Sequence, residues 1–279
     1  MKEKTILVTG GTGFLGQRLV RSIVKNGGTA IATGYSEARI KKFERGPNGG
    51  VPLYSVDIAS DYTMLKNIIK KHSVDYIIHT AALKHVGICQ DNPARAVDVN
   101  VIGSRNIARA AMEGNVKNVI GISTDKSIEP LCLYGMTKRL MEEMFIEYGF
   151  GIFQGVNFLF SSESVLDVWD KLRSQNEPIL VNMQANRYFS TIKEVQDRVL
   201  SSIKEKGKFS VEHCYKISIY SLYRAYATYH DYWNMKEYIP REFEKTEEEL
   251  PLQNIKIIEP DDQHVTQLMK QFYESLKTA

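Results

Sequence analysis

The sequence has few cysteines, no long apolar run and little net charge, and each shortage excludes a class of protein. Its cysteines, Cys89, Cys132 and Cys214, form no metal-binding spacing and are too few for a disulfide framework, which favours a reducing, cytoplasmic compartment. The net charge of +3 over 279 residues predicts no binding to nucleic acid or to a membrane surface. No apolar run is long enough for a transmembrane helix or a signal peptide. We therefore expect a cytoplasmic protein with no metal site.

Short apolar runs alternate with amphipathic segments through the first half of the chain. Five runs, at 5–9, 29–34, 52–58, 74–82 and 117–124, are typical of buried strands, and helical patterns occupy 14–28, 36–44, 61–72, 93–114 and 134–149. Strands that alternate with helices form parallel βαβ units. The pattern predicts an α/β fold with a doubly wound parallel Rossmann sheet.

The composition changes after residue 155, where glycine becomes rarer and aromatic residues become more frequent. Tyrosines recur every three residues within 218–233, which indicates one face of a helix packed on the sheet domain, and 241–250 is highly charged and predicted to be solvated. We expect an NADP-binding Rossmann domain at 1–155 and a smaller, partly interleaved substrate lobe at 156–279, part of which completes the sheet. Pockets commonly form between such lobes.

A glycine-rich stretch, TGGTGFLG, separates the first strand from the first helix. Gly10 permits a tight turn, Gly13 lets the backbone approach a pyrophosphate, and Gly16 lets the helix pack closely on the strand. The helix N-terminus offers free N–H groups to the phosphates. Because the glycines lie in a strand–turn–helix context, they predict a dinucleotide site.

The end of the second strand indicates which dinucleotide binds. NAD sites usually carry an acidic residue there, whereas this strand ends at Gly34 and is followed by Tyr35 and Ser36. Ser36 and Arg39 could hold the 2′-phosphate of NADP, although Glu37 could face a ribose and NAD remains possible. Asp57 either binds the adenine amine or caps the following turn.

A tyrosine and a lysine four residues apart begin the helix at 134–149. Tyr134 and Lys138 share one face of this helix, and a nearby ammonium favours the phenolate. A phenolate can accept a hydroxyl proton while hydride leaves to a nicotinamide. Ser123 and Thr124 end the preceding strand, and Asp125 and Lys126 follow them.

Three stretches together resemble a known family: TGGTGFLG (9–16), HTAALKHVGICQDNPARAVDVNVIGSRNI (79–107) and ISTDKSIEPLCLYGMTK (122–138). The chain is similar to extended short-chain dehydrogenases/reductases, and within them to the UDP-N-acetylglucosamine 4,6-dehydratases of bacterial surface-polysaccharide pathways. The resemblance covers residues 3–147 and is weak beyond them. It implies that a UDP-N-acetylhexosamine is the substrate and that the protein forms a homo-oligomer.

The resemblance also implies roles for individual residues. Tyr134 would deprotonate the sugar 4-hydroxyl, Lys126 would remove the C5 proton and Asp125 would help the C6 hydroxyl leave, with Lys138 completing the catalytic set. The implied substrate contacts are Lys84, His85, Thr124, Asn157 and Arg187. The cofactor set that we expect is Gly10, Thr12, Gly13, Phe14, Leu15, Gly16, Ser36, Arg39, Asp57, Ile58, Ala81, Ala82, Lys84, Asn100, Tyr134 and Lys138.

Departures from the family pattern gather on the substrate side. Cys132 replaces an asparagine, Gln154 an arginine and Phe160 a glycine, and Ser162 and Glu163 stand where Arg-Gly is typical. These changes leave three hypotheses open. The protein is a dehydratase with a rebuilt substrate lobe, an NADPH-dependent reductase or epimerase acting on the keto or 5,6-ene product of a partner dehydratase, or a non-catalytic dinucleotide-binding regulator.

Overall fold

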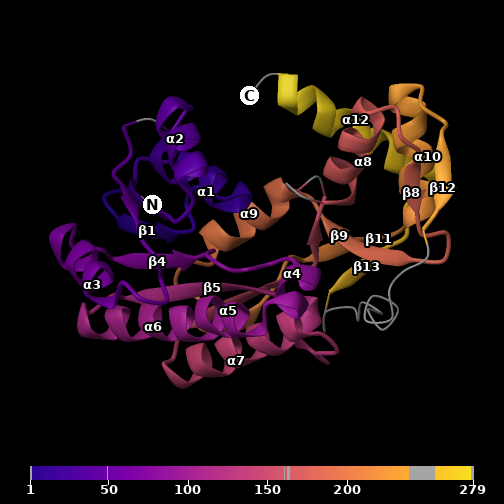
Figure 1. The fold of residues 1–279 in the computed structure, drawn as a ribbon. Helices are drawn as coiled ribbons and strands as arrows, with labels where there is room; N and C mark the ends of the chain where they lie inside the picture. Colours follow the sequence, from indigo (N-terminus) through magenta and orange to yellow (C-terminus); the bar gives the residue numbers. More distant parts are fainter. Residues whose placement is uncertain (1, 49, 160, 162–163, 239–254, 278–279) are drawn as a thin grey trace. The chain divides into compact units, whose positions relative to one another are not determined.

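The computed structural model describes residues 2–48, 50–159, 161, 164–238 and 255–277 (Figure 1). The chain divides into two compact units. Unit 1 contains residues 1–155 and 195–210, and unit 2 contains residues 156–194 and 211–279.

Unit 1 is built on a seven-stranded parallel sheet with the order β10-β6-β5-β4-β1-β2-β3. The order reverses direction at β1, as in a doubly wound sheet, so the predicted Rossmann fold is confirmed. The third and fourth strands are shorter than predicted. The strands are β1 (Thr5–Thr9), β2 (Thr29–Gly34), β3 (Leu53–Ser55), β4 (Tyr76–His79), β5 (Asn118–Thr124), β6 (Gly151–Gly155) and β10 (Gly207–Phe209).

Helices cover both faces of this sheet, with α1 on one face and α6 and α7 on the other (Figure 1). The predicted helix at 93–114 forms as one continuous helical stretch, but its middle widens into a π-helical turn, η1. The helical segments are α1 (Phe14–Lys25), α2 (Glu37–Arg45), α3 (Tyr62–Lys71), α4 (Val86–Asp91), α5 (Pro93–Val97), η1 (Asp98–Ile102), α6 (Gly103–Glu113), the 3-10 turn η2 (Asp125–Ser127), α7 (Leu133–Glu147) and α9 (Ile192–Ser201).

The core of unit 1 lies between the sheet and these helices. Apolar side chains of the central strands, such as Leu7, Ile77 and Val119, are fully buried against Ile107 of α6 and Phe145 of α7. Burying side chains of this size stabilises the fold by about 1.5–3 kcal/mol each. The core fixes the carboxyl ends of the strands, and most of the predicted site residues of unit 1 follow the ends of β1, β2, β3, β4 and β5.

Unit 2 has a four-stranded sheet, β13-β11-β9-β7, and a two-stranded sheet, β12-β8. The predicted tyrosine-rich helix is confirmed as α10, but its partner differs from the one expected, because Tyr223 and Tyr226 are buried against Trp169 and Met269 of unit 2 itself. The segment 241–250 lies outside the described residues. The elements are β7 (Asn157–Phe158), α8 (Val165–Ser174), β8 (Ile179–Val181), β9 (Asn186–Ser190), β11 (His213–Ser218), α10 (Ile219–His230), β12 (Met235–Glu237), β13 (Lys256–Ile258) and α12 (Asp262–Lys277).

Candidate active site

The glycine turn between β1 and α1 has no room for larger residues. Gly10 has a φ of +66°, and a Cβ there would lie 2.7 Å from the Ala81 nitrogen. A Cβ on Gly16 would lie 2.3 Å from the Gly10 carbonyl oxygen. No side chain caps the N-terminus of α1, which leaves the first-turn N–H groups of Phe14 and Leu15 available to an anion. This geometry fits a dinucleotide pyrophosphate.

The end of β2 leaves no space for an acidic side chain. A Cβ on Gly34 would lie 2.6 Å from the Thr12 Cγ2 atom, so an aspartate at this position would have to displace the Thr12 side chain. Tyr35, Ser36 and Arg39 follow, all of them exposed, with Ser36 at the N-cap of α2. The Thr12 side chain packed against Gly34 disfavours the carboxylate that an NAD ribose usually meets.

Asp57 stabilises the turn after β3 and also forms an ion pair with an arginine side chain. Its Oδ1 accepts a hydrogen bond from the Ala59 N–H at 3.0 Å, and its Oδ2 accepts one from Arg95 at 3.0 Å. The guanidinium of Arg95 also lies over the Tyr35 ring, 5.4 Å from its centroid. Arg95 was not predicted, because it stands in a helix 38 residues after its partner. Ile58, another predicted contact, is buried and packs beside Gly103.

Asn100 lies in the π-helical turn and joins two parts of the site. Its side chain is buried, accepts a hydrogen bond from the Leu83 N–H at 2.8 Å and donates to the Leu83 carbonyl at 2.9 Å and to the Thr137 hydroxyl at 3.0 Å. It therefore connects the loop after β4 to α7. In that loop Ala81, Ala82 and His85 are half-buried and Lys84 is exposed. A π-helical turn often marks a functional position.

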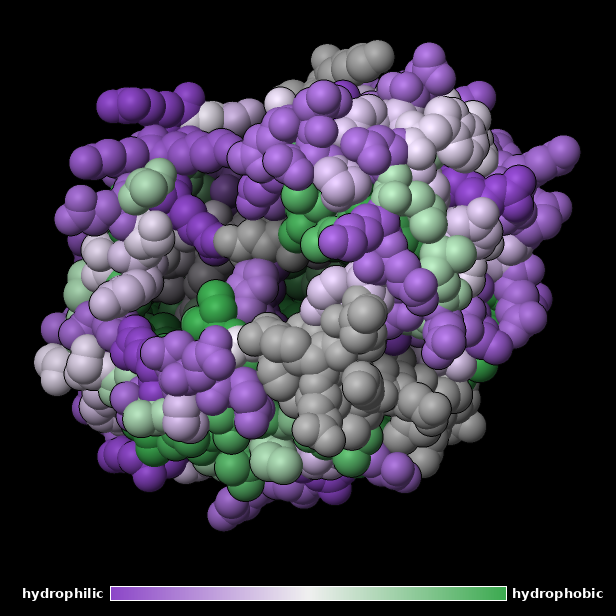
Figure 2. Space-filling view, turned by 45° about the vertical axis from the view of Figure 1, so that its right-hand side comes forward, coloured by the Kyte–Doolittle hydropathy of each residue, from purple (hydrophilic) through white to green (hydrophobic). Residues whose placement is uncertain are grey.

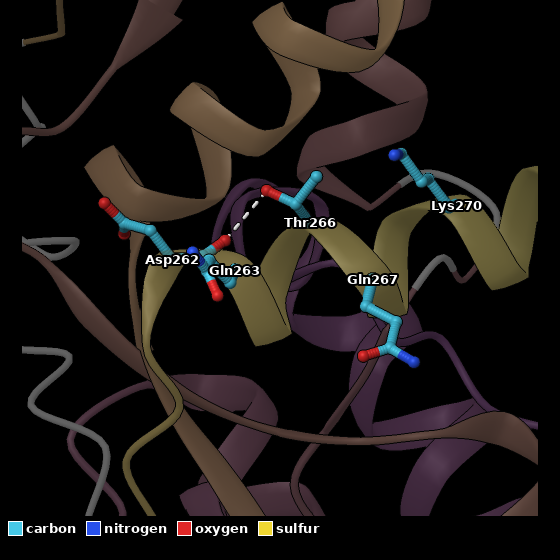
Figure 3. A pocket seen from close by; sticks show the side chains of 5 residues that line it. All are labelled: Asp262, Gln263, Thr266, Gln267 and Lys270. Atoms are coloured by element: carbon cyan, nitrogen blue, oxygen red, sulfur yellow. Dashed lines mark hydrogen bonds between the residues drawn. The ribbon is translucent and has the colours of Figure 1, made fainter.

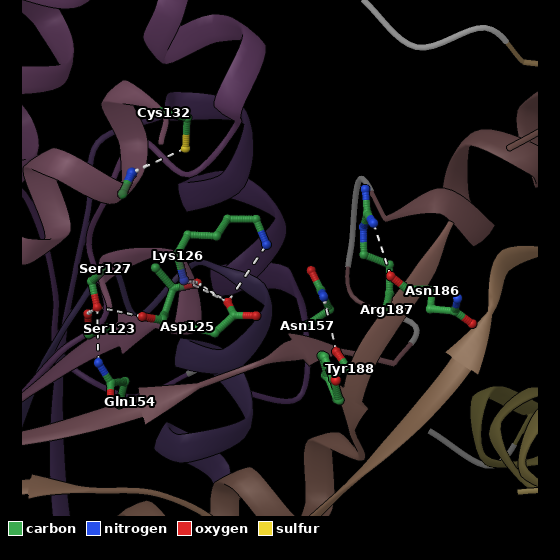
Figure 4. A network of polar contacts seen from close by, with 12 residues as sticks. Ser123, Asp125, Lys126, Ser127, Cys132, Gln154, Asn157, Asn186, Arg187 and Tyr188 are labelled. Carbon is green, nitrogen blue, oxygen red and sulfur yellow. Dashed lines mark hydrogen bonds and ion pairs between the residues drawn. The ribbon is translucent and has the colours of Figure 1, made fainter. Parts of the chain in front are cut away.

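Asp125 and Lys126 form the turn η2 at the carboxyl end of β5 (Figure 4). Asp125 is buried, and its Oδ1 accepts hydrogen bonds from the Thr124 hydroxyl at 2.8 Å and from the Lys126 N–H at 3.0 Å. The Lys126 ammonium lies 3.7 Å from the same oxygen. The predicted acid and base are therefore a largely buried ion pair rather than a solvated surface pair.

Tyr134 is the second residue of α7 and is half-buried. Burial raises the pKa of Tyr134 above the ordinary phenol range, the charge of Lys126 opposes this rise, and the charge of Asp125 adds to it. In the structure the ammonium of Lys126 therefore lowers the pKa of the phenol, a role that the sequence assigned to Lys138. The predicted elimination pair and the predicted oxidation base form one electrostatic unit.

Lys138 is buried in the next turn of α7. Burial lowers the pKa of Lys138 to about 8, while the charge of Glu142 acts in the opposite direction. Its Nζ lies 3.5 Å from the Met141 sulfur. A lysine in this environment changes protonation near neutral pH, which is typical of functional lysines.

A buried carboxylate, Glu142, was not predicted to belong to the site. Its Oε1 accepts hydrogen bonds from the hydroxyls of Ser123 and Ser127, and its Oε2 forms an ion pair with Lys208 of β10. Glu142 follows Tyr134 and Lys138 at intervals of four, so it shares their helix face. That spacing was the sequence signal for Glu142, whereas nothing in the sequence pointed to Lys208.

Two of the family departures lie in unit 1. Cys132 is buried at the N-cap of α7, where its sulfur accepts a hydrogen bond from the Gly135 N–H at 3.5 Å. Gln154 donates to the Ser127 hydroxyl at 3.1 Å and to Glu142 at 3.2 Å. Phe160, Ser162 and Glu163 lie outside the described residues.

The predicted substrate residues Asn157 and Arg187 belong to unit 2. Asn157 donates a hydrogen bond to the Tyr188 carbonyl at 3.0 Å, and Arg187 donates one to the Asn186 carbonyl at 3.0 Å (Figure 4). Parallel pairing of β7 with β9 brings Asn157 beside the strand that carries Arg187. These two residues therefore lie together in one sheet.

A shallow hollow on α12 contains none of the predicted residues (Figure 3). It is lined by Asp262, Gln263, Thr266, Gln267 and Lys270. Within the described part of the chain, no group of three or more His, Cys, Asp or Glu side chains is arranged to hold a metal ion. Nor is any helix there long and apolar enough to cross a bilayer.

Comparison with known proteins gives consistent matches. The family described as "Polysaccharide biosynthesis protein" matches residues 6–271. The chain is 34% identical over 212 residues to an uncharacterised membrane protein of Methanocaldococcus jannaschii, covering 72% of this chain and 63% of that protein. It is 30% identical over 215 residues to a UDP-N-acetylglucosamine 4,6-dehydratase (inverting) of Campylobacter jejuni, covering 72% of this chain and 64% of the dehydratase. The chain thus spans less than two thirds of the length of these relatives.

The fold itself is also found among solved structures. The X-ray structure of Pen from Bacillus thuringiensis superimposes with a TM-score of 0.85 at 21% identity. The superposition covers 97% of this chain and 99% of Pen. At this identity the likeness shows the fold alone.

Proposed function

Because the chain belongs to the polysaccharide biosynthesis protein family, we propose that it is an NADP-dependent short-chain dehydrogenase/reductase that acts on a nucleotide sugar. The proposed reaction is the 4,6-dehydration of a UDP-N-acetylhexosamine in surface-sugar biosynthesis. It comprises oxidation at C4, loss of water across C5 and C6, and return of the hydride to C6. The observation that carries this proposal is the buried Asp125–Lys126 pair, whose charges act on Tyr134.

The cofactor site uses the glycine turn and the residues after β2 and β3. The first-turn N–H groups of α1 bind the pyrophosphate, and Ser36 and Arg39 hold the 2′-phosphate. Arg95 adds a second cation near this position, since it contacts Asp57 and the Tyr35 ring. A nicotinamide dinucleotide bound here would accept the hydride from C4 and deliver it to C6.

The protein itself must supply two proton acceptors for this reaction. Tyr134 takes the 4-hydroxyl proton as C4 becomes a ketone. Within the ion pair the Lys126 ammonium first passes a proton to the Asp125 carboxylate, which leaves a neutral amine and a carboxylic acid. The ketone acidifies the C5 proton, which the Lys126 amine then takes. Asp125 donates a proton to the departing C6 hydroxyl, which leaves as water.

A second reaction is favoured by Gln154. The family resemblance predicts an arginine there, and the structure places the neutral amide against Ser127 and Glu142. An altered substrate side fits a reductase or epimerase that acts on the keto or 5,6-ene product of a partner dehydratase. In that reaction Tyr134 and Lys138 serve hydride transfer and the Asp125–Lys126 pair moves the C5 proton.

Incubation of the purified protein with UDP-N-acetylglucosamine, followed by NMR of the sugar, separates these functions. Loss of water without added NADPH supports the dehydratase. Lack of turnover alone, with consumption of a dehydratase product in the presence of NADPH, supports the reductase or epimerase. Failure of both reactions with cofactor still bound contradicts the proposal and favours a regulator.

The cofactor preference has a separate test by calorimetry. We expect NADP to bind more tightly than NAD, and Arg39→Ala and Arg95→Ala each to weaken NADP binding about tenfold while NAD binding changes little. Lys70→Met, an exposed change on α3, is the control. Equal affinity of the unaltered protein for both dinucleotides would contradict the NADP assignment.

A further inference from the structure

Glu142 is a fully buried carboxylate with an unusually complete set of partners. Its side chain has no exposed surface. Its Oε1 lies 2.5 Å from the Ser123 hydroxyl and 3.2 Å from the Gln154 amide, and the Ser127 hydroxyl also donates to it. A buried charge is costly unless it is paired and hydrogen-bonded, so these contacts are what allow Glu142 to remain inside.

The serines that bind Glu142 belong to the segment that carries the proposed acid and base. Ser123 is the second-to-last residue of β5, two residues before Asp125, and Ser127 is the third residue of η2, directly after Lys126. The Ser127 hydroxyl also lies 2.6 Å from the Thr124 carbonyl. The Glu142 carboxylate thus fastens η2 to α7, the helix that holds Tyr134.

The counter-charge for Glu142 comes from a distant part of the sequence. Lys208 lies on β10, in the segment 195–210 that returns to unit 1, and its Nζ is 2.6 Å from the Glu142 Oε2. Parallel pairing of β10 with β6 fixes Lys208 in register with Ile152. The Lys208 side chain is 32% exposed, so it remains partly hydrated while it neutralises a carboxylate with no exposed surface.

We propose that Glu142 is a positioning residue of the active site, with Lys208 as its counter-ion. The carboxylate holds η2 and α7 in the arrangement in which Asp125, Lys126 and Tyr134 act together. The segment 195–210 therefore completes the active site as well as the sheet. The positioning part of this inference rests on the proposed dehydration, whereas the electrostatic part applies to the protein without substrate.

The negative charge of Glu142 also acts on Lys138, one helical turn before it. The titratable groups that face Lys138 are Glu142 on α7, Cys89 on α4 and His79 on β4. His79 is buried between the hydroxyls of Thr9 and Ser104, and burial lowers its pKa to about 3, so it is neutral. Glu142 therefore supplies a negative charge that favours the protonated form of Lys138.

Replacement of Glu142 by glutamine tests both the positioning role of Glu142 and its electrostatic effect on Lys138. Glu142→Gln keeps the size of the side chain and an acceptor for the serines but removes the charge. The matched control is Glu143→Gln, the next residue of α7, which is exposed and pairs with Arg139. The Lys138 titration is followed by NMR of 13C- and 15N-labelled lysine in the protein without substrate, with the resonance assigned by its absence in Lys138→Met. Turnover is measured as kcat and KM for UDP-N-acetylglucosamine.

We expect Glu142→Gln to move the midpoint of the Lys138 titration to lower pH and to reduce kcat about 10- to 100-fold with little change in KM. Glu143→Gln should match the unaltered protein in both measurements. A merely structural role would lower the melting temperature but leave the Lys138 midpoint in place. An unchanged midpoint together with an unchanged kcat would overturn the proposal.

Lys208 provides a second pair of variants that does not alter α7. We expect Lys208→Gln to lower kcat and Lys208→Arg, which keeps the charge, to retain it. Equal kcat for Lys208→Gln and the unaltered protein would contradict the counter-ion role. If the unaltered protein does not turn over this sugar, the proposed function fails, and the Lys138 titration still decides the electrostatic part.

Discussion

Lys138 is a buried lysine whose pKa lies near 8 because burial opposes its charged form. Below that pH the folded protein holds a buried ammonium that water would solvate better. A pKa lowered from 10.5 to about 8 corresponds to a cost of about 3 kcal/mol at neutral pH. A residue that costs this much stability is expected to serve function.

We therefore predict that Lys138→Met raises stability while it abolishes turnover. The free energy of unfolding at neutral pH should increase by up to about 3 kcal/mol, measured by urea denaturation. Exposed Lys70→Met should change neither quantity. A less stable but active Lys138→Met protein would contradict the assigned role.

The lowered pKa of Lys138 also leads to a prediction of how the stability of the protein depends on pH. Between about pH 8 and pH 10.5 the unfolded chain holds the Lys138 proton and the folded protein does not. Stability therefore rises with pH across this window in the unaltered protein, and this contribution is absent in Lys138→Met. Urea denaturation of the two proteins at several pH values checks this, and parallel stability curves for both would refute it.

Lys126 gives a prediction about the chemistry itself. Lys126→Met removes the C5 base, so kcat for dehydration should fall at least about 100-fold. It also removes the positive charge that lowers the pKa of Tyr134, so the Tyr134 phenol should titrate at higher pH, as measured by NMR of 13C-labelled tyrosine. Unchanged dehydration in this variant would exclude Lys126 as the base.

The sequence predicted most of these residues but not which of them contact one another or which charge acts on which group. The Tyr134–Lys138 and Asp125–Lys126 pairs are visible as short motifs. That Lys126 acts on the phenol depends on how η2 packs against α7, which no local spacing encodes. Glu142 stands in the run MEEM, where only its spacing of four from Lys138 distinguishes it from the exposed Glu143.

Among the elements, η2 and α7 are in tight contact at Gly135. A Cβ on Gly135 would lie 2.1 Å from the Lys126 carbonyl oxygen, so only glycine fits beside Tyr134. Gly135 therefore allows η2, which carries the acid and the base, to pack directly on α7, which carries the phenol.

Gly135→Ala should push these two elements apart. We expect a loss of about 1–3 kcal/mol in stability and a fall in kcat that exceeds the change in KM, because the reacting groups are displaced. Glu147→Ala, at an exposed position on the same helix, is the control. Thermal unfolding and steady-state kinetics measure both effects, and wild-type kcat in Gly135→Ala would show that the contact does not matter for catalysis.

Helix periodicity predicted 93–114 as a helix but could not predict its π-helical turn. The widened turn contains Asn100, whose side chain bonds both backbone groups of Leu83 and the Thr137 hydroxyl. Because those contacts join segments far apart in the sequence, a local sequence pattern cannot predict them.

For the whole molecule, strand alternation predicted the Rossmann sheet, and part of 156–279 was expected to complete it, but the sequence did not identify β10 as the strand at its edge. β10 is three residues long and is formed by chain that follows part of unit 2. Its short sequence, GKF, has no distinctive strand pattern, and its partner β6 is more than fifty residues earlier. This return of the chain brings Lys208 to Glu142.

The surface of unit 1 supports a prediction about assembly. Figure 2 shows apolar surface along the lower edge of the view, at the level of α6 and α7 in Figure 1. On α7 the side chains of Met136 and Leu140 are 46% and 52% exposed, one turn apart. We propose that this face forms a homo-oligomer contact, because exposed apolar patches commonly mark interfaces.

Light scattering after gel filtration checks this proposal. The unaltered protein should be an oligomer, and the double variant Met136→Asp/Leu140→Asp should be a folded monomer. The double variant Lys66→Asp/Lys70→Asp on α3 should remain oligomeric. A monomeric unaltered protein would contradict the interface.

The most direct test of the proposed dehydration follows two labels in one experiment. The purified protein is incubated in D2O with UDP-N-acetylglucosamine that carries deuterium at C4, without added NADPH, and the product is examined by NMR and mass spectrometry. The account predicts a product that has lost one water, carries the C4 deuterium on C6 and has gained solvent deuterium at C5. A sugar recovered with its C6 hydroxyl intact and its C4 deuterium unmoved would contradict it.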